Sequence, residues 1–211
     1  MIAAIDCSSA DQSVALADPA GHPLGVTAWT AERGQGGELL PRLLELLDKR
    51  AASLHDVTAV AVAIGPGSFT GLRVGVALAK GLAIGLGCPI VGVGSLEAWL
   101  LAVPDADAAL ARAGAAEAYI QVRGEPQPQI VPFTALPPEA LGRRLVAPRD
   151  LALSLGLTRS EPPDMAAGAV ARMAAQRLAA GETDDLARLE PVYLRPPRGL
   201  AETAPAPITW L

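Results

Sequence analysis

The sequence has 211 residues, of which 51% are hydrophobic and 3% aromatic, and its formal net charge at pH 7 is −5. A chain of this length buries a sizeable hydrophobic core, either as one domain or as two small ones. The negative charge and the scattered arginines disfavour a protein that binds nucleic acid on its own, because such binding needs a basic surface. With only two cysteines, Cys7 and Cys88, the sequence also disfavours a disulfide-stabilised secreted protein.

No targeting or membrane segment is predicted. Glycines interrupt the longest apolar stretch before it reaches the about 18 residues that a membrane helix needs. The first residues lack the basic region and the apolar core of a signal peptide. We therefore expect a cytoplasmic protein that does not enter a membrane, with both cysteines acting as small buried hydrophobic side chains.

The chain opens with a pattern typical of a β-hairpin. Residues 2–5 and 13–17 are predicted strands, and the turn between them carries Asp6, Ser8 and Ser9. Aspartate and serine in turns usually bind nearby backbone N–H groups, and we favour that local role. One carboxylate without a second acid or a metal cluster is a weak basis for ATP hydrolysis, although contact with a nucleotide stays open.

A third strand is predicted at residues 24–29, followed by a loop at residues 34–37 and a helix at residues 38–51. This helix carries more leucines than a single buried stripe needs. We expect it to be buried on two sides, against the sheet and against a second surface in this chain or in another subunit. The leucines are Leu39, Leu40, Leu43, Leu44, Leu46 and Leu47.

Residues 57–96 form the most informative stretch, which reads as strand, glycine-rich turn, helix and strand. Two parallel strands joined by a helix make a right-handed βαβ unit, so the predicted fold class is α/β. Ser68 or Thr70 is positioned to cap the helix, which we expect to end near residue 85 or 87.

The turn at Gly65 and Gly67 has two interpretations. Glycines let the backbone approach a neighbour closely, and the helix that follows presents free N–H groups that suit an anion, with Arg73 as a further cation. A tight turn that needs glycine for packing explains the same residues, and we favour it. The lysine and Ser/Thr pair of a Walker-type phosphate loop does not follow these glycines, which excludes that kind of site here.

Small residues recur every four positions along the predicted helix, at Gly71, Gly75, Ala79, Ala83 and Gly87. Glycine inside a helix costs up to ~1 kcal/mol relative to alanine, so this stripe needs a compensating contact. Close approach of another backbone provides one, because the stripe lies on one side of the helix. The spacing alone leaves open whether that backbone is the chain's own sheet or a helix of another subunit.

The composition changes after residue 101, and we place a boundary there between a first lobe at residues 1–102 and a second at residues 103–211. The second half is predicted to contain short strands, a long helix, a last strand and a loose tail. These elements are assigned to residues 119–122, 130–133, 144–147, 164–180, 192–194 and 196–207, with a helical turn at 137–142.

No catalytic constellation stands out in the sequence. His22 and His55 are far apart, and Ser68 has no histidine nearby along the chain. Lys80 lies in the middle of the predicted helix and is expected to reach solvent. We therefore predict no catalytic residue and no metal site.

Several stretches resemble the signature of the TsaB (YeaZ) family. The longest is GPGSFTGLRVG at residues 65–75, followed by AKGLA at residues 79–83. IDCSS at residues 5–9 and EPVYLR at residues 190–195 are also similar to the family. The resemblance spans the chain and is strongest over roughly its first hundred residues and at the late motif. The signature turn comprises Gly65, Pro66, Gly67, Ser68, Phe69 and Thr70.

This resemblance implies an actin/Hsp70/sugar-kinase-like (ASKHA) ATPase fold with two lobes, of which the second is reduced. It also implies a place in the bacterial machinery that installs threonylcarbamoyl on adenosine 37 of tRNA. In that machinery a TsaB-like subunit is similar to a degenerate, non-catalytic paralogue of TsaD, the subunit that carries catalysis, while TsaE supplies ATPase function. We therefore expect a scaffold subunit that binds TsaD, with TsaE as a further partner and tRNA reached only through the complex.

The resemblance implies roles for particular residues as well. Asp6, Ser8 and Ser9 match the first phosphate loop of the ATPase superfamily, where an aspartate holds a hydrated metal ion. The family associates through two helices, which correspond here to residues 38–51 and 71–85. The implied partner interface comprises Leu39, Leu43, Leu47, Gly71, Arg73, Gly75, Ala79 and Ala83.

The sequence departs from the family pattern at two places. Many TsaB-like proteins have a histidine where this chain has Gln35, which removes a titratable group from that position. Residues 112–117 lack the aspartate of the Asp-Ala-Arg run that family members commonly have there. The second departure argues against a complete ATPase cleft between two full lobes.

Two rival functions stay open at this level. An independent small-molecule kinase or ATPase of the same fold class would use Asp6 and the turn at Gly65, and nucleotide turnover by the isolated chain would identify it. A self-sufficient homodimer would associate through the small-residue stripe without TsaD. No cofactor is firmly predicted, and ATP or ADP at an interface with the partner is left open.

Overall fold

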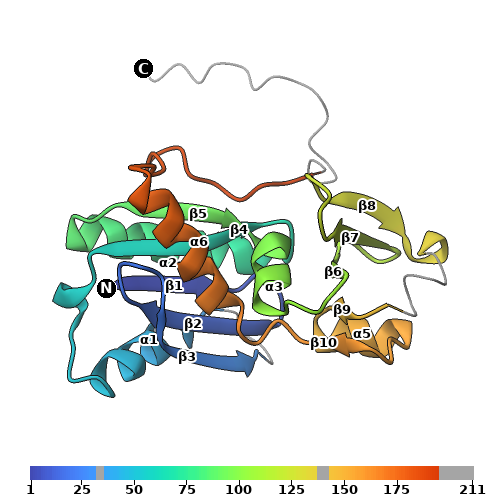
Figure 1. The fold of residues 1–211 in the computed structure, drawn as a ribbon, viewed down its shortest axis with the longest axis horizontal. Coiled ribbons are helices and arrows are strands. Elements are labelled where there is room, and N and C mark those ends of the chain that lie inside the picture. Colours follow the sequence, from blue (N-terminus) through green and yellow to red (C-terminus); the bar gives the residue numbers. More distant parts are fainter. Residues whose placement is uncertain (32–35, 137–142, 195–211) are drawn as a thin grey trace, which may run out of the picture.

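The computed structural model describes residues 1–31, 36–136 and 143–194. Within them the chain forms two lobes, each built on a five-stranded sheet, and the lobes lie side by side in Figure 1. Gln35, the predicted helical turn at 137–142 and the predicted tail at 196–207 lie outside the described residues.

The first sheet has the strand order β3-β2-β1-β4-β5. β1, β2 and β3 are antiparallel neighbours, whereas β4 and β5 run parallel to β1. This arrangement confirms the predicted hairpin, the third strand and the βαβ unit. β1, β2 and β4 are buried almost throughout, as apolar strands covered on both faces require. The strands are β1 (Ile2–Asp6), β2 (Asp11–Ala17), β3 (Pro23–Thr30), β4 (Ala59–Gly65) and β5 (Ile90–Gly94).

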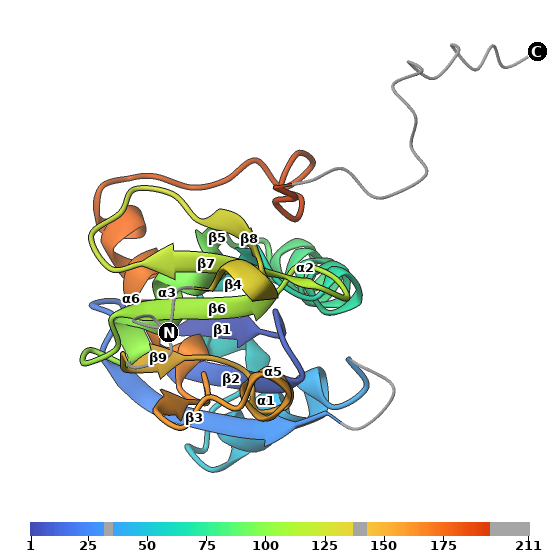
Figure 2. The ribbon, with the colours of Figure 1, turned by 90° about the vertical axis from the view of Figure 1, so that its right-hand side faces the viewer.

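Helices cover both faces of this sheet. The large side chains of α1 (Leu39–Asp48) and the inner face of α2 (Phe69–Leu86) pack on one face. On the other face, alanines of the sheet meet alanines of α3 (Ser95–Ala102) and α6 (Ala166–Ala179). Figure 2 shows α2 and α6 on opposite sides of the sheet. The first lobe is thus a three-layer sandwich of helices, sheet and helices.

The second lobe is smaller and holds a mixed sheet in the order β10-β9-β6-β7-β8. Two of its strands are only two residues long, and α5 (Arg149–Leu155) packs against the sheet through Leu151. The two-lobed α/β architecture with a reduced second lobe is therefore confirmed. The strands are β6 (Ala108–Arg112), β7 (Glu117–Val122), β8 (Gln129–Pro132), β9 (Leu145–Val146) and β10 (Ser160–Glu161), and short 3-10 turns occupy η1 (Leu54–Asp56) and η2 (Phe133–Ala135).

The second half of the chain does not remain in the second lobe. α6 packs on β1, β2 and β4, and the segment after it, red in Figure 1, runs back across the first lobe toward β8. The boundary predicted at residue 102 falls at the end of α3, between the two sheets. Residues 166–194 nevertheless join the first lobe by their packing, because the alanines of α6 complete its core.

Several elements differ from the sequence expectations, among them β6 and β10, which were not predicted as strands. α3 and α5 are helices that the sequence did not predict, because α3 is apolar on nearly every side and α5 is too short for a clear period. The strand predicted at residues 192–194 is wrong. That segment is held to the first sheet by one backbone hydrogen bond, from the Val192 N–H to the Ile64 carbonyl oxygen at 2.7 Å.

α2 contains 18 residues with a mean hydropathy of 1.4, so length and composition alone would allow it to cross a membrane. Its inner face, about a third of the helix, is buried in the first lobe. Core helices of folded proteins commonly have the same length and composition, and the packing on β1 and β4 accounts for the apolar character of that face. The outer face needs a separate explanation.

An ionic contact joins the two lobes at Arg149, the first residue of α5. The guanidinium lies 2.7 Å from the buried carboxylate of Asp11 on β2 and 2.6 Å from Asp164, just before α6. The Arg149 backbone N–H also donates to Asp11, at 2.8 Å. These hydrogen bonds, first to Asp164 and then to Asp11, raise the pKa of Arg149, so the guanidinium stays charged and fixes α5 against the first sheet.

Candidate functional site

The signature turn owes its glycines to close backbone contacts. Gly65 has a φ of +116°, and a Cβ atom there would lie 2.8 Å from the carbonyl oxygen of Val192. At Gly67 a Cβ atom would collide with the carbonyl oxygen of Ser8, in the turn between β1 and β2. The Ser68 N–H donates to that same oxygen at 2.7 Å. The two turns therefore touch directly, which supports the packing interpretation of these glycines.

Ser68 is the residue that caps α2. Its hydroxyl oxygen accepts a hydrogen bond from the Gly71 N–H at 3.2 Å, so it satisfies one of the free donors of the first turn. Thr70, the other predicted cap, lies inside the helix. At the far end the helix stops at Gly87, whose φ of +62° is the left-handed conformation that glycine accepts most readily.

Asp6 is fully buried, and its carboxylate is used inside the fold. One oxygen accepts hydrogen bonds from the N–H and the hydroxyl of Ser8, and the other accepts from the indole N–H of Trp99 at 2.8 Å. Burial raises the pKa of Asp6 against the lowering effect of these donors. Ser9 is also engaged locally, because its hydroxyl donates to the Asp11 carbonyl oxygen at 2.9 Å. The three residues predicted as a phosphate loop lie together, with their polar groups bound to the protein itself.

A cleft of about 380 Å³ opens beside these turns, between the two lobes. Ser9 and Ser68 line it from the first lobe, and Arg112, Tyr119 and Asp150 line it from the second. Among the described residues, no group of three or more His, Cys, Asp or Glu side chains is placed to hold a metal ion. A phosphate entering here would find the N–H groups of Ser8 and Ser68 already donating within the protein. Arg112 is the cationic side chain in this lining, and it lies 3.9 Å from the Asp150 carboxylate, which also lines the cleft and would repel an anion.

The late motif, which the sequence placed in a separate strand, docks on the signature turn and the start of α2. Tyr193 lies against Phe69, with ring centroids 5.3 Å apart, and its hydroxyl oxygen accepts a hydrogen bond from Nε of Arg73 at 3.1 Å. The Arg73 guanidinium in turn lies 4.0 Å from the centroid of the Phe69 ring. The two stretches that carry the family resemblance are therefore in contact, although more than a hundred residues separate them.

Most side chains of the predicted partner interface pack in the chain's own core in this structure. A Cβ atom on Gly71 would meet the carbonyl oxygen of Cys7, and one on Gly75 would meet its Sγ. The small-residue stripe thus lets α2 lie against β1, which settles the alternative that spacing left open. Arg73 alone of the predicted set is exposed. The buried members are Leu39, Leu43, Leu47, Gly71, Gly75, Ala79 and Ala83.

The exposed side of α2 carries a second row of residues at the same four-residue spacing. We call Phe69, Arg73, Ala77, Gly81 and Gly85, with Ile84 beside them, the outer α2 face; all are exposed. Ile84 is 66% exposed and Phe69 43%, and a Cβ atom on Gly81 or Gly85 would meet nothing within 4 Å. The sequence contained this signal, since Ala77, Gly81 and Gly85 recur every four residues, but only the structure shows which row faces outward.

The two cysteines, His22 and Lys80, which the sequence analysis also discussed, make contacts within the fold. Cys7 is buried and its thiol donates to the Gly71 carbonyl oxygen at 2.9 Å; burial raises the pKa of that thiol. Cys88 is half-buried, and the two cysteines are not bonded to each other. His22 pairs with Asp18 at the surface, 3.0 Å away. Lys80 does not simply extend into solvent, because its ammonium group donates to the Ala187 carbonyl oxygen at 3.3 Å.

The chain is similar to known proteins both in sequence and in structure. Residues 17–127, just over half of the chain, match the profile of the family described as TsaD: tRNA N6-adenosine threonylcarbamoyltransferase. The Escherichia coli (strain K12) tRNA threonylcarbamoyladenosine biosynthesis protein TsaB is 45% identical over 58 residues, which are 28% of this chain and 25% of that protein. A tRNA N6-adenosine threonylcarbamoyltransferase of Solidesulfovibrio magneticus is 46% identical over 78 residues, 37% of this chain and 21% of that protein.

The matched segments thus span a quarter or less of these relatives. In three dimensions the similarity is more extensive. A crystal structure from Pseudomonas aeruginosa, of an uncharacterized protein with similarity to peptidase YEAZ, superposes with a TM-score of 0.70 at 26% sequence identity. That superposition covers 92% of this chain and 99% of the other. The chain belongs to the family of the matching profile, and within it to the TsaB (YeaZ) group that its signature turn predicted.

Proposed function

We propose that this protein is a non-catalytic partner subunit in the synthesis of threonylcarbamoyladenosine in tRNA, and that it binds a TsaD subunit through the outer α2 face. The observation that carries this proposal is an apolar helix face, rich in small residues, that is left uncovered in the isolated chain. Large exposed apolar surfaces on a folded protein mark sites of association.

The chemistry of the outer α2 face suits a helix of another subunit. Ala77, Gly81 and Gly85 leave a strip of α2 almost without side chains, and the exposed side chains of Ile84 and Phe69 belong to the same face. Small residues allow two helix axes to approach at the short end of the roughly 8–10 Å range of packed helices. Arg73, stacked on Phe69, adds a fixed positive charge near the start of this face for a carboxylate of the partner.

The hydrogen bonds of Asp6 favour a partner subunit over a catalytic one. Its carboxylate accepts hydrogen bonds from Ser8 and Trp99. An ATPase of this fold class would need the aspartate at this position free to hold a hydrated metal ion. We propose that binding stabilises the competent conformation of TsaD by differential affinity, with tRNA contacted through the complex. TsaE as a further partner, ATP or ADP at the TsaD interface, and a cytoplasmic location complete the proposal.

The proposal is tested with Gly81→Glu, because the open space at Gly81 lets the substitution disturb binding to TsaD without disturbing the fold. The substitution places a charged side chain on the outer α2 face, where nothing lies within 4 Å of the added Cβ, so the fold accommodates it. Replacing a helical glycine should even stabilise the isolated chain, by up to ~1 kcal/mol. The matched control is Leu153→Glu, since Leu153 is 85% exposed on α5 in the second lobe.

The measurement is light-scattering mass on a sizing column, for each variant alone and mixed with TsaD of the same organism. The native chain and Leu153→Glu should form a one-to-one complex, and Gly81→Glu should elute separately. A complex that survives Gly81→Glu would remove the outer α2 face from the proposal. A stable homodimer that ignores TsaD, or nucleotide turnover by the isolated chain that Asp6→Ala abolishes, would favour the rival functions.

A further inference from the structure

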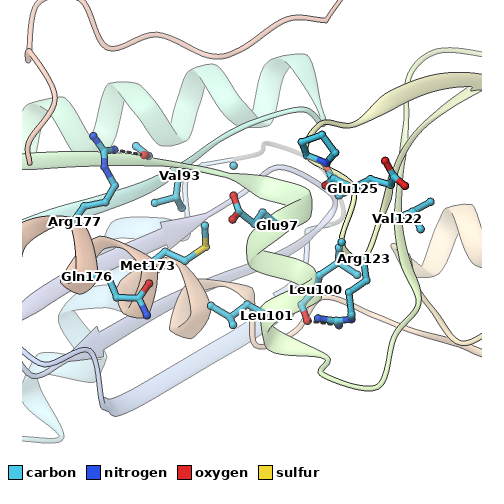
Figure 3. A pocket seen from close by; sticks show the side chains of 15 residues that line it. Val93, Glu97, Leu100, Leu101, Val122, Arg123, Glu125, Met173, Gln176 and Arg177 are labelled. Carbon is cyan, nitrogen blue, oxygen red and sulfur yellow. Dashed lines mark hydrogen bonds between the residues drawn. The ribbon is translucent and has the colours of Figure 1, made fainter.

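A cavity of about 710 Å³ lies between the lobes and shares no lining residue with the cleft beside the signature turn. β5, α3 and α6 form its wall in the first lobe, and β7 with the turn that follows forms its wall in the second. Figure 3 shows the side chains around it. The volume is in the range of sites that hold small organic molecules.

The floor of the cavity is apolar. Val93 of β5, Leu100 and Leu101 of α3, and Met173 of α6 line it, and Pro126 closes the side of the second lobe. Of these, Met173 offers a flexible, polarizable thioether that adapts to the shape of an apolar or aromatic group. The body of a ligand would therefore be hydrocarbon.

The two arginines that line the cavity use most of their printed hydrogen bonds to hold the protein itself together. Arg123 donates to the carbonyl oxygens of Leu100, Val103 and Ala106 at 2.8 to 2.9 Å, which closes the end of α3. Arg177 donates to the Gly92 carbonyl oxygen at 2.8 Å and pairs with Asp184 at 2.9 Å.

Free hydrogen-bond acceptors, in contrast, point to a donor ligand. Gln121 is more than nine-tenths buried, and its side-chain N–H donates to the Glu125 carbonyl oxygen at 2.6 Å. That bond fixes the amide orientation, so its Oε1 is an acceptor, and no donor among the described residues reaches it. Glu97, unlike Gln121, is exposed, and its carboxylate has no hydrogen-bond or ion-pair partner in the described part of the chain. Figure 3 shows Glu97 of α3 and Met173 of α6 turned toward one another across the cavity.

We propose that this cavity binds a small organic cation, a primary amine with an apolar body. Glu97, in the first lobe, would pair with the ammonium group, and the carbonyl oxygen of Gln121, in the second lobe, would accept another of its hydrogen atoms. The hydrocarbon part would lie over Met173 and Leu101. Because the two acceptors belong to different lobes, such a ligand would also tie the lobes together.

Glu97 has a second role that the experiment must separate from binding. It lies in the first turn of α3, and a carboxylate there stabilises a helix through the helix dipole. Thermal stability of a Glu97 variant is therefore not a valid readout. Affinity for a probe is one, because the effect on the helix does not depend on the probe.

The probe is 2-phenylethylamine, with the neutral and nearly isosteric 2-phenylethanol as its matched partner, titrated by calorimetry into the full chain. We expect the amine to bind to the native chain. The alcohol should bind to the native chain about tenfold or more weakly, because it lacks the charge for the charge-assisted hydrogen bond. The amine should bind to the Glu97→Gln variant about tenfold or more weakly for the same reason. Gln121→Met should weaken the amine several-fold. Glu45→Gln removes the same charge from an exposed position of α1 that does not line the cavity, and it should leave the affinity for the amine unchanged.

Three results would overturn the inference. The amine and the alcohol would bind equally if the cavity were only an apolar hollow. Glu97→Gln and Glu45→Gln would have equal effects if the amine were attracted only by the net charge of −5. Absence of heat for the amine at millimolar concentration would show that the cavity does not take this class of ligand. If Glu97→Gln fails to fold, Gln121→Met against Glu45→Gln decides the matter. Failure of this test leaves the proposed TsaD contact untouched.

Discussion

Along α2, small residues recur every four positions on two opposite faces. On the inner face, Gly71 and Gly75 lie so close to Cys7 that a single added carbon atom would collide with it. On the outer α2 face, Gly81 and Gly85 have open space at the same position. Glycine destabilises the helix on both faces, but only on the inner face does close packing against Cys7 compensate for it within the chain. On the outer α2 face no contact within the chain compensates for the glycines, and packing against a partner subunit would explain why they are there.

The largest expected effect comes from filling the inner face. Gly75→Leu should destabilise the native state by about 3 kcal/mol or more, because the side chain has nowhere to go between α2 and β1. Urea denaturation followed by circular dichroism measures this loss. Gly81→Leu on the outer face is the matched control and should be as stable as the native chain or slightly more so. Equal losses in both variants would contradict the distinction between the faces.

A smaller effect sharpens the distinction by testing which atom limits the approach. Gly75→Ala should destabilise because its Cβ meets Sγ of Cys7, and adding Cys7→Ala should recover part of that loss by removing the sulfur. A double-mutant cycle of unfolding free energies should give a coupling of about 1 kcal/mol between the two positions. Simple additivity would mean that backbone spacing, rather than Cys7, sets the need for glycine at residue 75.

The smallest effect concerns the end of α2, where the late motif docks. Tyr193→Phe removes the hydroxyl that accepts from Arg73 but keeps the ring against Phe69, so the isolated chain should lose only about 0.5 kcal/mol. The more informative readout is affinity for TsaD, because the lost hydrogen bond frees Arg73 within the outer α2 face. Titration calorimetry should show weaker binding. An unchanged affinity would place Arg73 outside the contact.

Local patterns in the sequence were sufficient for most of the first lobe. The hairpin, the βαβ unit and the start of α2 at its serine cap follow from alternation of apolar residues, turn residues and capping chemistry, which act within a few positions of the chain. α3 escaped prediction because it has no polar face: Leu96, Ala98, Trp99 and Leu100 are all buried, so it lacks the period that marks a helix. α5, with seven residues, offers too few positions for a period.

The sequence by itself determined the fold class, the family and the presence of a small-residue stripe, because these are written in local spacing and in an ordered motif. Only the tertiary structure decided which row of α2 faces the sheet, since both rows have the same spacing and differ only in what lies opposite. It also decided that Asp6 is bound by Trp99, that Tyr193 meets Arg73, and that Glu97 and Gln121 share a cavity. Each of these contacts joins residues distant in sequence, and no local pattern records which distant residues will meet.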